Sequence, residues 1–351
     1  MPSPAHLVGS LPFDSPREAM AAAFDRLGPC LRWVPDGETG DRRDWITHII
    51  ESCREHPDLE LRRDGAWTDY DDVPRFSIRP GRELSAEALE LGHLAAFETS
   101  YPVFEELREQ HGRGDVSFQV GIPGDLDLSL FTLGPFGPAR HRQPFTDATL
   151  REIRAIHARA GDDVVFQIEV PAELVFLART PGPAQPAMAA YLARGITDLA
   201  AAAPPSTRFG VHLCLGDMNH RALGRMRDVS PLVRLSNAIA ARWPEFRPLE
   251  FIHAPFAAAV EPPPNRRAFY QPLERLRLAP DTAFMAGFVH EALTLEAHRT
   301  LKAHLEGLIG RPIGVASSCG LGRRSREEAQ RCMDLAAALC GAAEPAVELG
   351  G

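Results

Sequence analysis

The chain has 351 residues, of which 44% are hydrophobic and 24% charged. This composition supports a sizeable folded core and argues against global disorder. The formal net charge of −9 argues against a nucleic-acid-binding surface, which requires clustered excess Lys and Arg. No basic segment followed by an apolar one opens the chain, and no run reaches about 18 uninterrupted apolar residues. We therefore expect no signal peptide, no membrane association and a cytoplasmic location.

Eight short apolar runs recur along the chain, and most of them precede a helical pattern. The runs begin at His6, Leu31, Val116, Val164, Phe209, Leu249, Phe284 and Ile313. Helices are predicted at Ser15–Leu27, Glu83–Gln110, Asp147–Ala160, Ala187–Ala203, Pro231–Trp243, Thr294–Ile309 and Ser325–Cys340. The first and last of these helices open with a Ser followed three residues later by Glu, which is a capping signature.

Strands that alternate with helices indicate parallel strands joined by right-handed crossovers. Eight such units favour a closed (β/α)₈ TIM barrel over an open doubly wound sheet, and we predict a single domain over residues 1–351. Additional Pro-, Gly- and charge-rich material lies at Asp58–Arg82, Leu126–Pro144 and Ala257–Arg267. These segments follow strands, where a barrel carries its functional loops, so we expect elaborated βα loops.

The six cysteines do not suggest a disulfide framework, because a chain of this length needs no covalent cross-links. We therefore expect reduced thiols, some of them free to bind metal or to react. Four of them fall before a strand or on helices and are predicted to be structural or free thiols. These four are Cys30, Cys53, Cys332 and Cys340.

Candidate metal ligands lie at the ends of two predicted strands. His212 and Cys214 are two residues apart on the fifth strand, so their side chains share one face. Cys319 ends the eighth strand, and barrel closure brings strand ends together. One His and two Cys are a suitable zinc set, since catalytic zinc sites use three protein ligands and one open position. The alternative is that the two thiols are small buried apolar groups and that the imidazole is a hydrogen-bonded core residue.

The sixth strand adds Glu250 and His253. His253 lies nearer the carboxyl end of the strand, so we expect it to be a further metal ligand or a proton-transfer group. Glu250 lies three residues deeper and has the opposite parity, so both cannot face the metal. As a second choice, Glu250 could orient a ligand histidine.

The sequence resembles the catalytic C-terminal barrel of cobalamin-independent methionine synthase, over nearly the whole chain and in the same order. The matching segments are Val8-Gly9-Ser10-Leu11-Pro12, Asp36-Gly37-Glu38 with Arg43-Asp44, Gln167-Ile168-Glu169-Val170-Pro171, His212-Leu213-Cys214 with Gly216, and Ser318-Cys319-Gly320-Leu321.

The resemblance implies zinc at His212, Cys214 and Cys319, with His253 at about the place of the family's fourth ligand, a Glu. It implies that the amino-acid end of a thiol such as homocysteine binds to three residues, Ser10, Glu38 and Glu169. It also places His290 near the family's catalytic histidine.

The sequence departs from the family pattern in three respects. The family's large N-terminal barrel has no counterpart, and Glu replaces Asp at position 169, which would alter the amine pocket. The folate-stacking tryptophan segment is not recognisable in 126–138, where Phe131 and Phe136 are the only aromatic residues. We therefore predict that folate is not the donor. Short relatives use a methyl group carried by a corrinoid protein, and another relative adds a thiol to an epoxide.

The predicted activity is zinc-dependent alkyl transfer to a small thiol, with His290 as an acid for the leaving group. Two other classes remain open. One is another reaction at the same zinc site, either epoxide opening by a thiol or C–S lysis. A sulfonate-type thiol would then use an Arg at the barrel mouth, for which Arg42, Arg323 and Arg324 are candidates. The other class is a metal-free, non-catalytic barrel, as in the related uroporphyrinogen decarboxylase superfamily.

Overall fold

Eight parallel strands form the centre of the computed structural model, which describes residues 3–341. They are β1 (Ala5–His6), β2 (Trp33–Pro35), β5 (Ser117–Pro123), β6 (Val164–Val170), β7 (Arg208–Leu213), β8 (Leu249–Pro255), β9 (Ala283–Val289) and β10 (Gly314–Ser317). Hydrogen-bonded neighbours follow the order β1-β10-β9-β8-β7-β6-β5-β2. A parallel bridge between Ala5 and Leu31 joins the two ends of this order. The predicted (β/α)₈ barrel is thereby confirmed.

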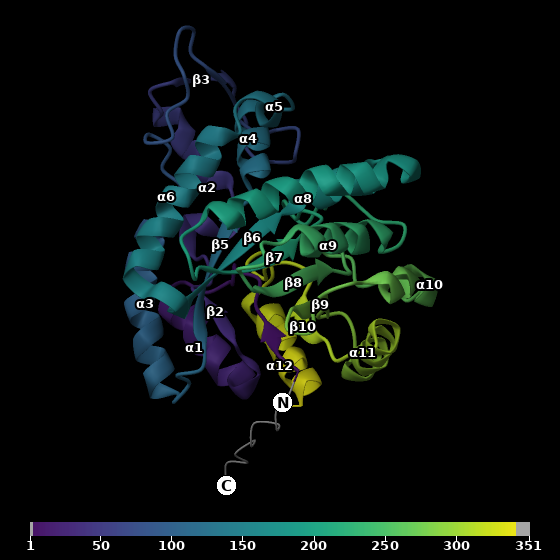
Figure 1. Ribbon diagram of the computed structural model, residues 1–351. Coiled ribbons are helices and arrows are strands. Elements are labelled where there is room, and N and C mark those ends of the chain that lie inside the picture. Colours follow the sequence, from purple (N-terminus) through teal and green to yellow (C-terminus); the bar gives the residue numbers. More distant parts are fainter. Residues whose placement is uncertain (1–2, 342–351) are drawn as a thin grey trace.

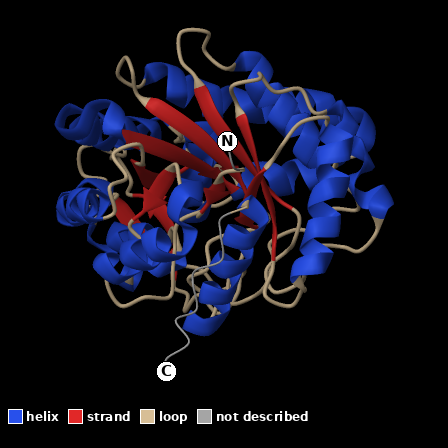
Figure 2. Cartoon of the chain, turned by 90° about the horizontal axis from the view of Figure 1, so that it is seen from below, coloured by secondary structure: helices blue, strands red, loops and turns tan. Residues whose placement is uncertain are grey.

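Helices surround the strands on all sides (Figure 2). The longer ones are α1 (Pro16–Leu27), α3 (His93–Gln110), α6 (Gln143–Ala160), α8 (Gln185–Ala202), α9 (Ser230–Arg242), α11 (Leu295–Ile309) and α12 (Arg326–Cys340). Shorter ones are α2 (Thr47–Ser52), α4 (Asp125–Leu133), α5 (Gly137–Arg140), α7 (Pro171–Arg179) and α10 (Arg267–Tyr270). Among residues 3–341, no helix combines the length and apolarity needed to cross a membrane.

Two predicted helix caps are present. The Ser15 hydroxyl accepts a hydrogen bond from the Glu18 backbone N–H at 3.3 Å. Ser325 and Glu328 form a reciprocal capping box at the start of α12. Each cap satisfies backbone N–H groups that have no partner inside the helix, which fixes where these helices begin.

One predicted helix begins too early, because α3 starts at His93 and not at Glu83. Gly92 has a φ of 82°, a left-handed conformation that no helix interior tolerates. The Glu152 carboxylate of α6 accepts hydrogen bonds from the backbone N–H groups of Leu91, Gly92 and Leu94. The start of α3 is therefore set by a side chain from another helix.

The segment 126–144, expected to be irregular, contains α4 and α5. The segment 58–82 contains an antiparallel hairpin of β3 (Leu59–Arg63) and β4 (Arg75–Ile78). We call residues 45–91 and 125–148 the inserted lobe; it stands above the barrel in Figure 1. It has an apolar cluster of its own, which includes Ile50, Leu59, Phe76, Leu128 and Phe145.

Strand register sets the level of the site. Glu169 on β6 lies beside His212 on β7, and His212 lies beside His253 on β8. All three positions are near the carboxyl ends of their strands, where barrel enzymes carry their active sites.

Candidate metal centre and substrate cavity

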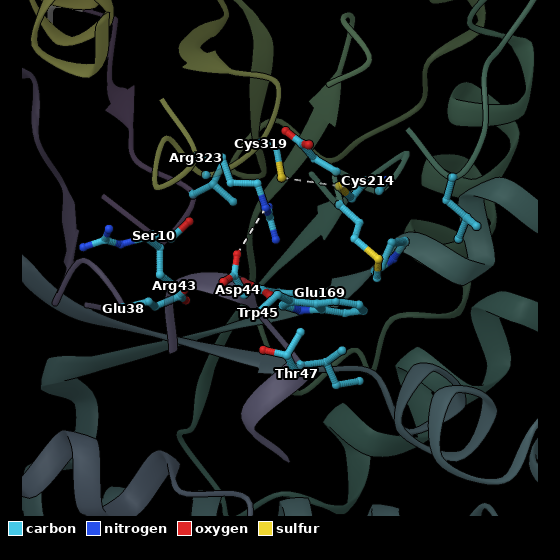
Figure 3. A pocket seen from close by; sticks show the side chains of 18 of the residues that line it. Ser10, Glu38, Arg43, Asp44, Trp45, Thr47, Glu169, Cys214, Cys319 and Arg323 are labelled. Carbon is cyan, nitrogen blue, oxygen red and sulfur yellow. Dashed lines mark hydrogen bonds and ion pairs between the residues drawn. The ribbon is translucent and has the colours of Figure 1, made fainter. Parts of the chain in front are cut away.

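A cavity of about 190 Å³ opens at the carboxyl end of the barrel strands, between the barrel and the inserted lobe (Figure 3). Six of the eight residues expected to form a site line it: Ser10, Glu38, Glu169, His212, Cys214 and Cys319. They come from five different strand ends or the loops that follow them. Barrel closure therefore brings together residues that are more than 300 positions apart in the sequence.

His212, Cys214 and Cys319 meet on one side of this cavity. One potential ligand atom from each lies within 4.8 Å of the other two. The two Sγ atoms are 3.6 Å apart, and thiolates bound tetrahedrally at about 2.3 Å from zinc would be about 3.8 Å apart. The spacing of the thiols thus fits a single zinc ion with little rearrangement.

The two thiols differ in acidity. The hydrogen bond between the two sulfurs lowers the pKa of the Cys319 thiol. The same hydrogen bond, together with burial, raises the pKa of Cys214. The backbone N–H of Gly216 also donates to the Cys214 sulfur, at 3.3 Å. Of the two thiols, Cys319 is therefore the one that loses its proton more readily.

His253 is placed behind His212 and outside the group of three candidate ligands. Its Nε2–H donates to the Ser317 carbonyl at 2.9 Å, so its Nδ1 is an acceptor. Because the two Nδ1 atoms are 2.6 Å apart, His212 must donate from Nδ1, which leaves its own Nε2 free to bind a metal. Burial lowers the pKa of His253 to about 4 and that of His212 well below its usual value, so both rings are neutral.

The structure does not place His253 among the three candidate ligands, because both of its ring nitrogens are engaged, so its predicted role as a metal ligand stays a prediction. Its hydrogen bond to His212 is instead the contact expected of a residue that orients a ligand histidine. That role had been considered for Glu250, which also lies away from the site. The Glu250 carboxylate pairs with Arg208 at 2.8 Å, near the amino ends of β7 and β8. A partner on the second ring nitrogen is a usual feature of metal-binding histidines, because it fixes tautomer and orientation.

Two carboxyl groups, Glu38 and Glu169, form another side of the cavity. A Cβ atom at Gly121 would lie 2.7 Å from an oxygen of each of them, so this glycine leaves room for the pair. Glu169 accepts hydrogen bonds from Gln167 at 2.9 Å and from Trp45. Burial raises the pKa of Glu169 to about 7. Burial and then repulsion from Glu169 raise the pKa of Glu38. Such a pair disfavours two charges unless a cation joins it.

Ser10 connects the loops that follow the first and the last strand. Its backbone carbonyl accepts a hydrogen bond from Leu321 at 2.8 Å. A Cβ atom at Gly320 or Gly322 would collide with the Ser10 side chain. Ser10 therefore packs closely against the loop that carries Cys319, and these two glycines permit the close approach.

Two of the predicted site residues, His253 and His290, do not line the main cavity. His290 lies elsewhere at the barrel mouth. It borders a smaller cavity on the other side of Cys319. Its Nδ1 accepts from the Ala292 N–H at 3.1 Å, so its Nε2 donates to the Val260 carbonyl at 3.2 Å. Burial lowers its pKa. Its role as the acid for a leaving group stays a prediction.

An aromatic wall was missed at the level of sequence. Trp45, Trp67 and Tyr70 from the first part of the inserted lobe line the cavity together with Phe131 from α4. The loop of the β3–β4 hairpin is held over the cavity by Asn219, whose side-chain amide donates to the carbonyls of Trp67 and Thr68. Nothing local in the sequence indicates this long-range contact.

The cations at the cavity mouth are few. Of the three arginines considered for an anionic substrate, Arg323 lines the main cavity, where it pairs with Asp44 at 3.4 Å (Figure 3). Arg42 binds Asp36, and Arg324 lies by the smaller cavity with Glu291. The main cavity is therefore lined by two guanidinium groups, those of Arg43 and Arg323, and by four carboxyl groups, those of Glu38, Asp44, Glu169 and Asp217.

Comparison with known proteins gave matches in structure only. No protein-family model and no curated protein matches the sequence. A B12-independent methionine synthase from Shewanella sp. W3-18-1, solved in complex with selenomethionine, is 15% identical with a TM-score of 0.59, covering 97% of this chain and 98% of its own. A putative vitamin-B12 independent methionine synthase from Listeria monocytogenes is 11% identical with a TM-score of 0.58, at the same coverage. A methyltransferase from Methanosarcina mazei is 12% identical with a TM-score of 0.52, covering 97% and 94%. Over almost its full length, the chain shares the barrel fold of B12-independent methionine synthase-like proteins.

Proposed function

We propose that this protein is a zinc-dependent transferase that moves a methyl or other alkyl group onto the sulfur of a small thiol. One observation carries the proposal: a His, Cys, Cys donor set lies at one side of a cavity whose other side holds two carboxyl groups. The first set suits a soft metal and a sulfur ligand, and the second suits an ammonium group.

His212, Cys214 and Cys319 would hold the metal. When bound, zinc would keep a coordinated thiol deprotonated, and the thiolate is the nucleophilic form. Two Cys ligands make the centre electron-rich, which favours a reactive sulfur over the activation of water. His253 contributes by holding His212 in the tautomer whose Nε2 carries a lone pair.

The acceptor in this proposal is homocysteine or a close amino-acid analogue. Its ammonium group would lie between Glu38 and Glu169, and its carboxylate would face Arg323. The Shewanella neighbour was solved with selenomethionine, which is the kind of thioether amino acid that such a transfer yields, with selenium in place of sulfur. The aliphatic part of the thiol substrate would contact the aromatic wall of Trp45, Trp67, Tyr70 and Phe131.

The alkyl donor is a separate question. The expectation that folate is not the donor was based on a lack of aromatic residues in 126–138. The structure supplies Trp45, Trp67 and Tyr70 from another segment, so that reason no longer holds. A small-molecule donor and a corrinoid protein both remain candidates, and turnover of homocysteine with methyltetrahydrofolate polyglutamate or with a methylated corrinoid protein distinguishes them.

The test of the proposed function begins with metal analysis of protein purified without chelator. We expect about one zinc ion per chain and tight binding of homocysteine only to the zinc-loaded protein. A protein that folds normally but takes up no zinc contradicts the proposal and favours a metal-free barrel. Equal affinity for homocysteine and its des-amino analogue would instead favour a thiol without an amine, such as an alkanesulfonate.

A further inference from the structure

The aromatic wall lines the main cavity together with the candidate metal ligands. It consists of four side chains, those of Trp45, Trp67, Tyr70 and Phe131. The rings of Trp45 and Phe131 stand almost perpendicular to each other, with centroids 5.9 Å apart and an angle of 88° between their planes. Trp45 and the thiols of Cys214 and Cys319 lie around the same space (Figure 3). A molecule that contacts the wall therefore shares one cavity with the candidate metal ligands.

The backbone that carries this wall is strained. Among residues 3–341, seven residues other than glycine have a left-handed φ, and four of the seven line the main cavity. Two of these four belong to the wall, Trp45 with a φ of 56° and Trp67 with a φ of 57°, and the other two are Glu38 and Asn219. Such conformations cost free energy and cluster at sites where a side chain must be held in place for function. The strain thus indicates that the two indoles serve the cavity and not only the packing of the lobe.

The charges around the cavity favour a cation. Four carboxyl groups and two guanidinium groups line it, and one of these guanidinium groups, that of Arg323, pairs with Asp44. Under the proposed function, the two Cys thiolates neutralise a divalent zinc ion, so a bound substrate thiolate gives the centre a net negative charge. Aromatic rings are negative on their faces and attract cations, and methylated cations are a characteristic ligand of such rings.

The position of His290 bears on the leaving group. His290 is the predicted acid, but it does not line the main cavity, and both of its ring nitrogens are engaged. Glu38 and Glu169 are occupied by the amine of the thiol in the proposed function. A methyl group on neutral nitrogen or oxygen leaves an anion behind, which needs an acid. A methyl group on positively charged sulfur or nitrogen leaves a neutral thioether or amine, which needs none.

We propose that the alkyl donor is a small onium cation, a methylated sulfonium or quaternary ammonium compound, which binds against the aromatic wall; this inference rests on the proposed function. In the transfer, a lone pair of the substrate thiolate forms a bond to a methyl carbon, and the bond from that carbon to the positive sulfur or nitrogen breaks. The bonding electrons stay on the leaving atom, which becomes neutral. The thiol proton passes to solvent when the thiol binds, so an anion and a cation become two neutral products. A partly buried cavity accommodates such a step more readily than one that creates charge.

The first experiment measures binding to zinc-loaded full-length protein. Choline and 3,3-dimethylbutanol have the same shape, but only choline carries a positive nitrogen, so calorimetry with this pair isolates the effect of the charge. We expect choline to bind on the order of 10-fold more tightly. Equal affinities would overturn the inference, because they would show a wall that binds only apolar groups.

Variants separate the rings from the carboxyl groups, which also attract cations. W45L removes one ring and should weaken choline binding on the order of 10-fold, whereas W45F keeps an aromatic face and should retain most of the affinity. F136L is the matched control, since Phe136 is an aromatic residue of the same lobe that is 77% exposed and does not line the cavity. Equal choline affinity in W45L and F136L would overturn the role of the wall. Circular dichroism of each variant checks that it is folded.

Methyl transfer then identifies the kind of onium. Zinc-loaded protein with homocysteine receives trimethylsulfonium or tetramethylammonium with deuterated methyl groups, and mass spectrometry detects labelled methionine. Label from one of the two cations supports the inference and identifies the leaving atom as sulfur or nitrogen. Label from neither would overturn the inference, while the proposed function would stand as long as zinc and homocysteine bind. A protein that takes up no zinc would remove both proposals.

Discussion

Replacement of Glu169 by Gln tests the carboxyl pair, because it should have two opposite effects. The substitution keeps the shape and an oxygen that can accept the hydrogen bond from Gln167. It removes a carboxyl group whose pKa is raised by burial from an ordinary value of 4.5 to about 7. We expect the empty protein to become more stable above neutral pH, and the amine of the substrate to bind less tightly.

The stability effect follows from proton linkage. Folded wild-type protein holds the Glu169 proton more tightly than the unfolded chain does, so its free energy of unfolding falls as pH rises from about 4.5 to 7. Each pH unit in this interval corresponds to about 1.4 kcal/mol, so the loss amounts to about 3 kcal/mol at most. E169Q avoids that loss. It should therefore exceed the wild type in stability above pH 7 and match it below about pH 4.5, as measured by urea unfolding.

The binding effect comes from the lost charge. A hydrogen bond to a charged group contributes about 1.5–3 kcal/mol, so homocysteine should bind E169Q about 10- to 150-fold more weakly. Its des-amino analogue should bind both proteins equally. In the wild type, the preference for homocysteine over the analogue should decrease as pH falls below about 7, since Glu169 must then release a proton to meet the ammonium group. Calorimetry from pH 5.5 to 8.5, with zinc content held constant, measures these affinities. An equal loss for both thiols would refute the reasoning.

The remaining predictions concern the metal centre. C319S should lose zinc, because a hydroxyl replaces one of two thiolate ligands; full zinc occupancy in elemental analysis would contradict the assignment. H253F should retain the three ligands but bind zinc about 10- to 100-fold more weakly in chelator competition, because His212 loses the acceptor that fixes its tautomer; unchanged affinity would refute that orienting role. G216A should lower the free energy of unfolding by about 1–2 kcal/mol or more, because of its left-handed φ and the close Tyr70 hydroxyl; wild-type stability in urea would show that the turn adapts.

The barrel was predictable because its strands are continuous apolar runs, as buried parallel strands usually are. The inserted lobe was not. Helix α4 is buried on nearly every side, so its sequence from Asp125 to Leu133 has no amphipathic pattern of helical period. Strand β3 pairs with one neighbour and exposes most of its residues, so Leu59–Arg63 is too polar to be read as a strand. Packing against distant parts of the chain determines both elements.

Two rules predict part of the site: alternate residues of a strand share one face, and the strand ends meet at the mouth of the barrel. His212 and Cys214 are predicted in this way. The role of His253 was not predictable, because it depends on the register between β7 and β8. That register places the two histidines side by side, so that one ring hydrogen-bonds the other. Tyr70 lies on the loop of the β3–β4 hairpin, and its place in the cavity depends on the docking of that loop by Asn219. This contact leaves no pattern in the local sequence.

Two separately packed units, the barrel and the inserted lobe, line the cavity together. The candidate metal ligands and Glu169 belong to the barrel, whereas Trp45, Trp67 and Phe131 belong to a lobe with its own apolar cluster. Substitutions in the lobe can therefore accumulate without disturbing the packing that orients the thiols. Under the proposed function, remodelling of this one appendage would change the alkyl donor and leave the barrel intact, and a chimera that carries a foreign lobe on this barrel tests that separation.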